Sequence, residues 1–166
     1  MTDDPTVLVI GGGATGTGIA RDLASRGVDA TLVDRGGLGS GTSGRSHGLL
    51  HSGARYAEAD AEGARECIEE NRTLREIAGA CVRESDGLFV RLDGDDPDYF
   101  EEKIAACETV GIPTERLDGD AAREAVAGLA PEVEEAFRVP DGVVYPSRLV
   151  AANAADAERR GASVHP

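Results

Sequence analysis

The chain has 166 residues, of which 31 are acidic and 17 are basic, so its formal net charge is −14. This length suffices for a domain with its own hydrophobic core, and the negative charge argues against nucleic acid as a partner, because phosphate backbones repel an acidic surface. No apolar run approaches the roughly 20 residues of a membrane-spanning helix, and the first residues do not form a signal peptide. We therefore expect a cytoplasmic protein with no transmembrane segment of its own.

Two features of the composition concern the cellular environment. Lys103 is the only lysine, and an acid-rich, lysine-poor composition is typical of a halophilic protein, because high salt screens the repulsion among acids. The alternative is an ordinary acidic protein. The three cysteines, Cys67, Cys81 and Cys107, are scattered and form no CxxC pair. This pattern fits a reducing compartment and predicts that the thiols pack in the interior rather than take part in redox chemistry or bind a metal.

The pattern of residues 7–34 is typical of a dinucleotide-binding unit. An apolar, β-branched run at 7–10 predicts a buried parallel strand. A helical pattern follows, and Gly27 ends it. A second strand is predicted at 30–33, so the stretch forms a strand–helix–strand unit.

The turn between the first strand and the helix carries Gly11, Gly13 and Gly16 in GxGxxG spacing. These glycines permit a sharp turn, the close approach of a pyrophosphate and the close packing of the helix on the sheet. Asp34, at the end of the second strand, can accept hydrogen bonds from ribose hydroxyls. The alternative is a plain glycine-rich turn, and this stretch alone does not separate FAD from NAD.

Residues 36–53, GGLGSGTSGRSHGLLHSG, are dense in glycine and hydroxyl side chains. Glycines allow close backbone approach, hydroxyls donate hydrogen bonds, and Arg45 supplies a planar cation. This mixture suits a loop wrapped around a phosphate-bearing cofactor, and the alternative is a solvated surface loop.

The remaining elements follow from apolar periodicity, caps and turn residues. The first is an amphipathic helix at 61–81, with a solvated polar face that includes Arg72 and Arg75, and a strand at 87–92 in a second sheet follows it. Two helices come next, one that Asp98 caps and that runs to Val110, and one at 118–129. The last elements are a turn at 140–142 between two strand-like runs, a helix that Ser147 caps and Gly161 ends, and the start of a strand at 162–164. The acidic run 93–98 does not match a calcium-binding EF-hand loop, because Pro97 and Asp98 occupy the wrong positions, so we expect a surface loop there.

Several of these segments together resemble one protein family. The segments GGGATGTGIARDLASRG, GTSGRSHGLLHSGARYA, ARECIEEN, GLFVRL and VPDGVVYPSRLVAANAADAERRGA are similar to the catalytic chains of the anaerobic, FAD-dependent glycerol-3-phosphate dehydrogenase family. The wider relatives are FAD oxidoreductases of the D-amino-acid-oxidase type. The motif SHGLLHSGARY is specific, since a generic Rossmann protein does not carry it.

The resemblance implies that FAD is the cofactor. It implies that the glycine-rich turn holds the pyrophosphate and that Asp34 holds the adenosine ribose, although the family usually has the longer Glu there. It also implies that the segment ending at Leu50 runs beneath the flavin. The full set of residues that we expect to bind the cofactor is Gly11, Gly13, Ala14, Thr15, Gly16, Asp34, Arg35, Gly41, Thr42, Ser43, Ser46, His47, Gly48, Leu49 and Leu50.

The resemblance places His51, Arg55 and Tyr56 in the segment that faces the substrate. An arginine fork suits the phosphate of glycerol 3-phosphate, but Arg55 can instead polarise the reacting hydroxyl or pair with an acid. Tyr56 can donate a hydrogen bond or simply pack. His51 can take the hydroxyl proton, or it can pack on the flavin or bond to the backbone.

We therefore expect an α/β fold with a Rossmann-type FAD-binding βαβ unit and the first part of an α+β substrate-cap region. The expected divisions are 1–85 for the FAD-binding unit, loop and helix, 86–146 for the partial cap, and 147–166 for a return helix and the start of a third strand. The family continues beyond this length, so the chain is expected to be an N-terminal fragment with an incomplete domain.

The activity implied by the resemblance is oxidation of sn-glycerol 3-phosphate to dihydroxyacetone phosphate. Hydride goes to flavin N5, and electrons pass through partner subunits, including a membrane anchor, to quinone. The protein would then lie at the inner face of the cell membrane. The alternatives are a related FAD oxidoreductase of another hydroxy or amino acid, a truncated fragment that binds nucleotide without catalysis and, more remotely, an NAD-dependent dehydrogenase.

Overall fold

The computed structural model describes residues 6–166, which form two compact units. One unit contains the chain up to Gly48 together with Val144–Pro166, and the other contains Leu49–Val143. The predicted divisions at 85/86 and 146/147 differ from these boundaries. The helix at 61–78 was expected with the cofactor-binding unit, but its buried face shares a core with residues of the second unit.

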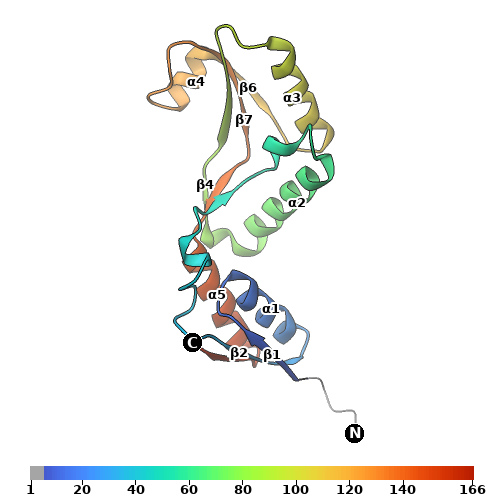
Figure 1. Cartoon of the computed structure of the whole chain (residues 1–166), viewed down its shortest axis with the longest axis vertical. Coiled ribbons are helices and arrows are strands. Elements are labelled where there is room, and N and C mark those ends of the chain that lie inside the picture. Colours follow the sequence, from blue (N-terminus) through green and yellow to red (C-terminus); the bar gives the residue numbers. More distant parts are fainter. Residues whose placement is uncertain (1–5) are drawn as a thin grey trace. The chain divides into compact units, whose positions relative to one another are not determined.

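The first unit is a parallel sheet with two helices on one face. Its strands are β1 (Thr6–Ile10), β2 (Asp29–Val33) and β9 (Ser163–His165), in the order β1-β2-β9. Its helices α1 (Ala14–Ser25) and α5 (Pro146–Arg159) lie side by side (Figure 1). The strand–helix–strand prediction is confirmed, including the stop at Gly27, whose φ is +75°.

The core of this unit lies between the sheet and the two helices, and small side chains let the helices approach closely. Val9 and Leu32 from the strands meet Ala20 of α1 and Ala157 of α5. The prediction that 7–10 is buried throughout is wrong. Successive strand residues point to opposite faces, and Ile10 on the other face is 80% exposed.

The second unit contains two small sheets. The first has the order β3-β8-β4, from β3 (Leu49–Leu50), β8 (Gly142–Val144) and β4 (Val82–Glu84). The second is antiparallel with the order β5-β7-β6, from β5 (Gly87–Leu92), β7 (Val133–Val139) and β6 (Glu115–Asp118). The strand-like runs on either side of the 140–142 turn therefore belong to different sheets.

Helices cover both faces of the sheet β5-β7-β6 (Figure 1). Phe137 of β7 stacks on Phe89 with ring centroids 4.9 Å apart, and it packs against Phe100 of α3 (Pro97–Thr109). The neighbouring Ala136 points to the opposite face and packs with Ala122 of α4 (Gly119–Ala125). Helix α2 (Ala61–Ala78) and the short 3-10 helix η2 (Ala54–Tyr56) contribute to the same core as α3.

Several predicted helix ends differ from the structure. Asp96, not Asp98, caps α3, because its carboxylate accepts from the Asp98 N–H while Pro97 fills the first helical position. Helix α5 begins at Pro146, so Ser147 lies inside it. Helix α4 ends at Ala125 rather than at 129, and α2 passes into the 3-10 helix η3 (Gly79–Cys81) before 81.

The cysteines have the predicted packing role. Cys81 and Cys107 are buried and Cys67 is half-buried, and all three are free thiols. Burial raises the pKa of the Cys107 thiol to about 11, so this thiol stays protonated and unreactive at neutral pH. No helix among residues 6–166 has the length and apolarity needed to cross a membrane.

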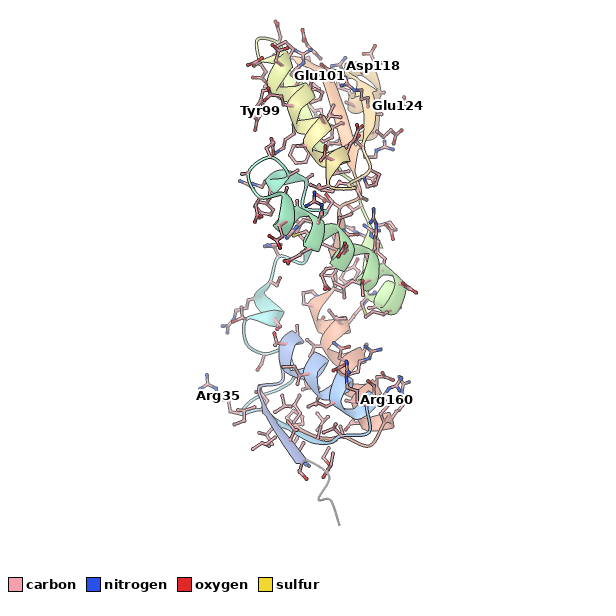
Figure 2. All side chains as sticks on the ribbon, turned by 90° about the vertical axis from the view of Figure 1, so that its right-hand side faces the viewer. Arg35, Tyr99, Glu101, Asp118, Glu124 and Arg160 are labelled. Atoms are coloured by element: carbon pink, nitrogen blue, oxygen red, sulfur yellow. The ribbon has the colours of Figure 1, made fainter. Side chains whose placement is uncertain are left out.

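An ion cluster joins the two helices of the first unit. The Asp156 carboxylate on α5 accepts hydrogen bonds from Arg160 at 3.0 Å, from Arg21 on α1 at 2.9 Å and from Arg159 at 2.9 Å. Arg160, labelled in Figure 2, lies at the end of α5. These arginines, Arg160 foremost, hold the pKa of the Asp156 carboxyl well below its ordinary value.

We expect the variant Asp156→Asn to melt a few degrees lower than the parent chain at pH 7. Because the folded-state pKa is depressed far below the unfolded-state pKa of about 4, the stabilisation is fully present above pH 4 and declines as the pH falls from there through the folded-state pKa. Thermal unfolding at pH 7, 5 and 3 measures this, and the difference between the two melting temperatures should be equal at pH 7 and 5 and smaller at pH 3. Glu158→Gln, which removes an exposed carboxylate from the same helix, is the control; a constant difference at every pH would contradict the prediction.

Candidate cofactor and substrate site

The glycine-rich turn brings the N-terminus of α1 against the end of β1. Gly11 has φ +116°, which favours glycine, and its N–H donates to the Val33 carbonyl at 2.8 Å, which fastens the turn to β2. A Cβ atom at position 16 would overlap the Gly11 carbonyl oxygen. The helix can therefore approach the turn this closely only with glycine at 16, as the sequence pattern predicts.

Ser43 joins the second predicted loop to the start of α1. Its hydroxyl oxygen accepts from the Ala14 N–H at 2.9 Å, and a Cβ on Gly13 would lie 2.9 Å from the same oxygen. The helix N-terminus carries amide donors without intrahelical acceptors and a partial positive charge. Hydroxyl and amide donors thus meet at one place, which is the arrangement that suits a pyrophosphate.

Asp34 fixes the shape of the glycine-rich turn. One carboxylate oxygen accepts from the Gly12 N–H and the other from the Gly36 N–H, both at 2.7 Å. These two hydrogen bonds lower the pKa of the Asp34 carboxyl, and the bond from Gly12 has the larger effect. Each oxygen has a second lone pair, so the carboxylate can still accept a further bond. The adjacent Arg35 is exposed and projects from the ribbon (Figure 2).

The residues that follow return to the start of α5. Gly48 has φ +71°, and its carbonyl accepts from the Val144 N–H at 2.7 Å. Its N–H donates to the Ser46 hydroxyl at 3.2 Å. Other predicted cofactor residues of this unit, Thr15, Gly41, Thr42 and His47, are exposed. The structure therefore gathers the turn, Ser43 and Asp34 at the carboxyl ends of β1 and β2, which is where open α/β sheets bind ligands.

The predicted substrate-facing residues lie together in the second unit. The rings of His51 and Tyr56 meet edge to face with centroids 5.8 Å apart. His51 is half-buried, and its Nδ1 atom is buried without a hydrogen bond inside residues 6–166. Tyr56 is 46% exposed, and Leu50 is buried in β3 whereas Leu49 is exposed.

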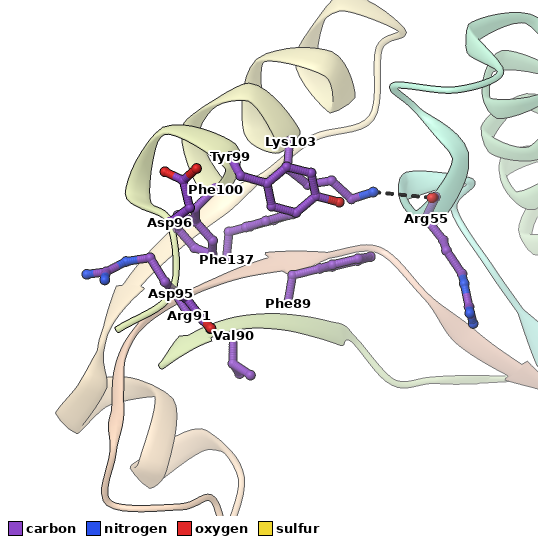
Figure 3. A pocket seen from close by; sticks show the side chains of 10 residues that line it. All are labelled: Arg55, Phe89, Val90, Arg91, Asp95, Asp96, Tyr99, Phe100, Lys103 and Phe137. Carbon is purple, nitrogen blue, oxygen red and sulfur yellow. Dashed lines mark hydrogen bonds between the residues drawn. The ribbon is translucent and has the colours of Figure 1, made fainter. Parts of the chain in front are cut away.

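Arg55 presents its guanidinium outward. The side chain is exposed, and in the part of the chain that the structure describes it makes no ion pair, so the predicted alternative of a structural partner is not realised there. Its carbonyl accepts from Lys103 Nζ at 3.2 Å, and Figure 3 shows the guanidinium extending away from that lysine. Lys103 also pairs with Glu58 at 2.5 Å and lies 5.4 Å from the Phe89 ring centroid. It thus fixes the backbone of η2 from which Arg55 projects.

This unit contains cavities beside the predicted substrate-facing residues. One of about 660 Å³ has an aromatic lining that includes Phe89, Tyr99 and Phe100 (Figure 3). Another of about 300 Å³ is lined by His51, by both leucines of β3 and by residues of α2. His51 is therefore the only predicted substrate-facing residue that borders the smaller cavity among those described.

Sequence reasoning missed three residues that support this segment: Asn71, Arg75 and Asp141. Arg75 was expected on a solvated helix face, but its guanidinium donates to the carbonyls of the 140–141 turn. A signal for Asn71 was present, because it follows Ala64 and Ile68 at helical spacing on the buried face of α2. A polar residue in an apolar stripe needs hydrogen-bond partners.

The chain is similar to several known proteins. Residues 6–166 match the DAO family model, described as FAD dependent oxidoreductase. The chain is 57% identical over 164 residues to the A1 chain of the anaerobic glycerol-3-phosphate dehydrogenase of Haloferax volcanii, covering 99% of this chain and 28% of that protein. It is 51% identical over 158 residues to the corresponding chain of the anaerobic glycerol-3-phosphate dehydrogenase of Escherichia coli K12, covering 95% of this chain and 29% of that protein.

A solved structure of an L-proline dehydrogenase from P. horikoshii superposes with a TM-score of 0.74 at 28% identity, covering 99% of this chain and 44% of that one. The chain spans less than a third of the length of the two glycerol-3-phosphate dehydrogenase relatives described above.

A pair of glycines on α1 offers a matched test of the close approach. Gly16→Ala should abolish FAD retention and lower the melting temperature, because the added methyl overlaps the Gly11 carbonyl. Gly18→Ala meets only Asn153, at 3.9 Å, and should keep FAD and add up to about 1 kcal/mol of stability through helix propensity. Flavin absorbance after gel filtration and thermal melting measure both. Equal behaviour of the two variants would show that the close approach does not matter.

Proposed function

Because the chain belongs to the DAO family of FAD-dependent oxidoreductases, we propose that it forms the cofactor-binding part of an enzyme that oxidises sn-glycerol 3-phosphate to dihydroxyacetone phosphate. The observation that carries this proposal is the 57% identity over 99% of the chain to the Haloferax volcanii protein, which is named an anaerobic glycerol-3-phosphate dehydrogenase. The specific segment SHGLLHSGARY, residues 46–56, supports it, since it contains His51, Arg55 and Tyr56 and runs through β3 and η2.

The residues of the first unit fit FAD. In the proposal, the amides of the turn and of the α1 N-terminus bind the pyrophosphate with the Ser43 hydroxyl beside them. Asp34 accepts a ribose hydroxyl with a lone pair that its bonds to Gly12 and Gly36 leave available. When bound, FAD supplies the acceptor for the hydride of the substrate carbon.

The residues of the second unit suit the substrate. Glycerol 3-phosphate carries a dianionic phosphate, and the exposed Arg55 guanidinium presents the planar fork that binds such oxygens. His51 takes the proton of the reacting hydroxyl, since imidazole is the most common general base, and Tyr56 against its ring limits where the imidazole can lie. Electrons leave to quinone through partner subunits that hold the enzyme at the inner face of the membrane, as the resemblance implies.

A second substrate class is favoured by one specific observation. The L-proline dehydrogenase from P. horikoshii shares the fold at 28% identity. In an enzyme of that kind, Arg55 would bind a carboxylate instead of a phosphate. The two hypotheses differ in the substrate that reduces the flavin.

We expect the chain, purified in high salt with FAD and freed of unbound flavin, to keep a visible flavin spectrum. In a full-length enzyme that carries this sequence, anaerobic glycerol 3-phosphate should bleach that spectrum, whereas L-proline should not. Bleaching by L-proline alone would support the second substrate class. A flavin that no substrate reduces would favour a non-catalytic nucleotide-binding protein.

Arg55→Ala in the same full-length enzyme should retain FAD and lower kcat/KM for glycerol 3-phosphate roughly ten- to hundred-fold, the usual effect of losing a charged hydrogen bond. Arg65→Ala removes the same charge from an exposed position on α2 and should leave the kinetics unchanged. Steady-state kinetics on both variants decide this. Near-parental values for Arg55→Ala would remove that residue from the substrate site.

A further inference from the structure

A buried polar network lies beneath the segment that carries His51. Its centre is Asn71 on α2, which is 1% exposed. The Asn71 amide nitrogen donates to the Leu50 carbonyl at 3.3 Å and to the Pro140 carbonyl at 3.1 Å. Both acceptors are backbone groups of the sheet β3-β8-β4 or of the turn that leads into it.

Arg75, one helical turn further along α2, orients this amide. Its Nε donates to the Asn71 side-chain oxygen at 2.6 Å. Since arginine can only donate, this bond places the amide oxygen toward Arg75 and the amide nitrogen toward the two carbonyls. The Arg75 Nη2 atom donates to the carbonyls of Pro140 and Asp141 at 3.1 and 2.9 Å, and the side chain also pairs with Glu84.

The 140–141 turn, which Arg75 holds, also bonds to the segment that carries His51, on the C-terminal side of that residue. The Asp141 carboxylate accepts from the Ser52 N–H at 2.7 Å. Its other oxygen is packed against Gly87, where an added Cβ would lie 2.5 Å away. The Asp141 side chain is therefore confined both by its hydrogen bond and by β5.

These contacts bracket one residue. The carbonyl immediately before His51 and the N–H immediately after it each bond to the network, and Leu50 and Ser52 are 7% and 0% exposed. Antiparallel pairing of Leu50 with Gly142 adds a third constraint. With both flanking peptides fixed, His51 keeps its backbone position and can vary only its side-chain rotamer.

We propose that Asn71, Arg75 and Asp141 form a positioning clamp that fixes the backbone on both sides of His51 and so sets the place of its imidazole in the substrate site. The catalytic consequence rests on the proposed function, whereas the clamp itself is a property of the second unit. An apolar side chain at 71 could fill the same space, but it would remove the donor to the Leu50 and Pro140 carbonyls and the acceptor of the Arg75 Nε–H. The network therefore holds the backbone beside His51 through oriented hydrogen bonds as well as through packing.

The test uses a near-isosteric substitution. Asn71→Asp keeps the oxygen that faces Arg75 but replaces the donor to Leu50 with an acceptor. Arg75→Lys removes the fork that joins Asn71 to the 140–141 turn and serves if Asn71→Asp does not fold. The matched control is Arg72→Lys, because Arg72 on the same helix also donates to a backbone carbonyl, that of Gly111 at 2.7 Å, which does not adjoin His51.

The first readout needs no substrate. In NMR spectra of the chain, Asn71→Asp should speed hydrogen exchange of the Ser52 amide at least about ten-fold and should shift or broaden the His51 ring signals, which stand among those of only three histidines. Arg72→Lys should change neither. Parental exchange at Ser52 together with unchanged His51 signals in the clamp variants would overturn the clamp.

The second readout concerns catalysis in a full-length enzyme that carries this sequence. The clamp variants should keep FAD and a KM within about three-fold of the parent, while kcat falls about ten- to a hundred-fold, because a small misplacement of a reacting group costs rate more than binding. A loss of activity that only follows a loss of FAD would assign the network a merely structural role. If the parent enzyme itself does not turn over glycerol 3-phosphate, the proposed function fails, and the NMR result still decides the clamp.

Discussion

The first unit depends on the contact between α1 and the turn that precedes it. The Gly16 backbone lies where a Cβ would overlap the Gly11 carbonyl, and this contact sets the distance between helix and sheet. The small residues Ala20 and Ala24 continue the close approach along α1. Since a helix that lies this close points its N-terminal amides past the end of β1, the same contact that builds the core also shapes the proposed cofactor site.

In each unit, side chains that accept from backbone N–H groups hold the loops that carry the candidate residues. Asp34 accepts from Gly12 and Gly36, Ser43 accepts from Ala14, and Asp141 accepts from Ser52. A backbone N–H outside a helix or strand needs such an acceptor when it is shielded from water. The side chain that satisfies it also fixes the loop, so polar residues here serve both the hydrogen bonding of the backbone and the placement of the functional groups.

The elements of the fold could largely be predicted from the sequence because their signals are local. The strand and helix of residues 6–25 and the second strand follow from apolar periodicity and glycine positions. Helix ends were less predictable where two candidate caps compete. Asp96 and Asp98 have equivalent side chains, and Pro97 between them decides for Asp96, because proline suits the first helical position. The exposure of Ile10 could not be read from residue type, since it depends on which face of the sheet the helices cover.

The sequence by itself determined the dinucleotide-binding unit, the family to which the chain belongs and the positions of the candidate residues, because spacing along a short stretch fixes the turn and the helix start. Only the tertiary structure decided how His51 is held. Ser52 and Asp141 are 89 residues apart, and Asn71 and Pro140 are 69 apart. Contacts over such separations arise from the packing of α2 against the turn before β8, which no local pattern encodes. For the same reason Arg75, which has the sequence signature of a solvated helix face, is a structural donor in the folded chain.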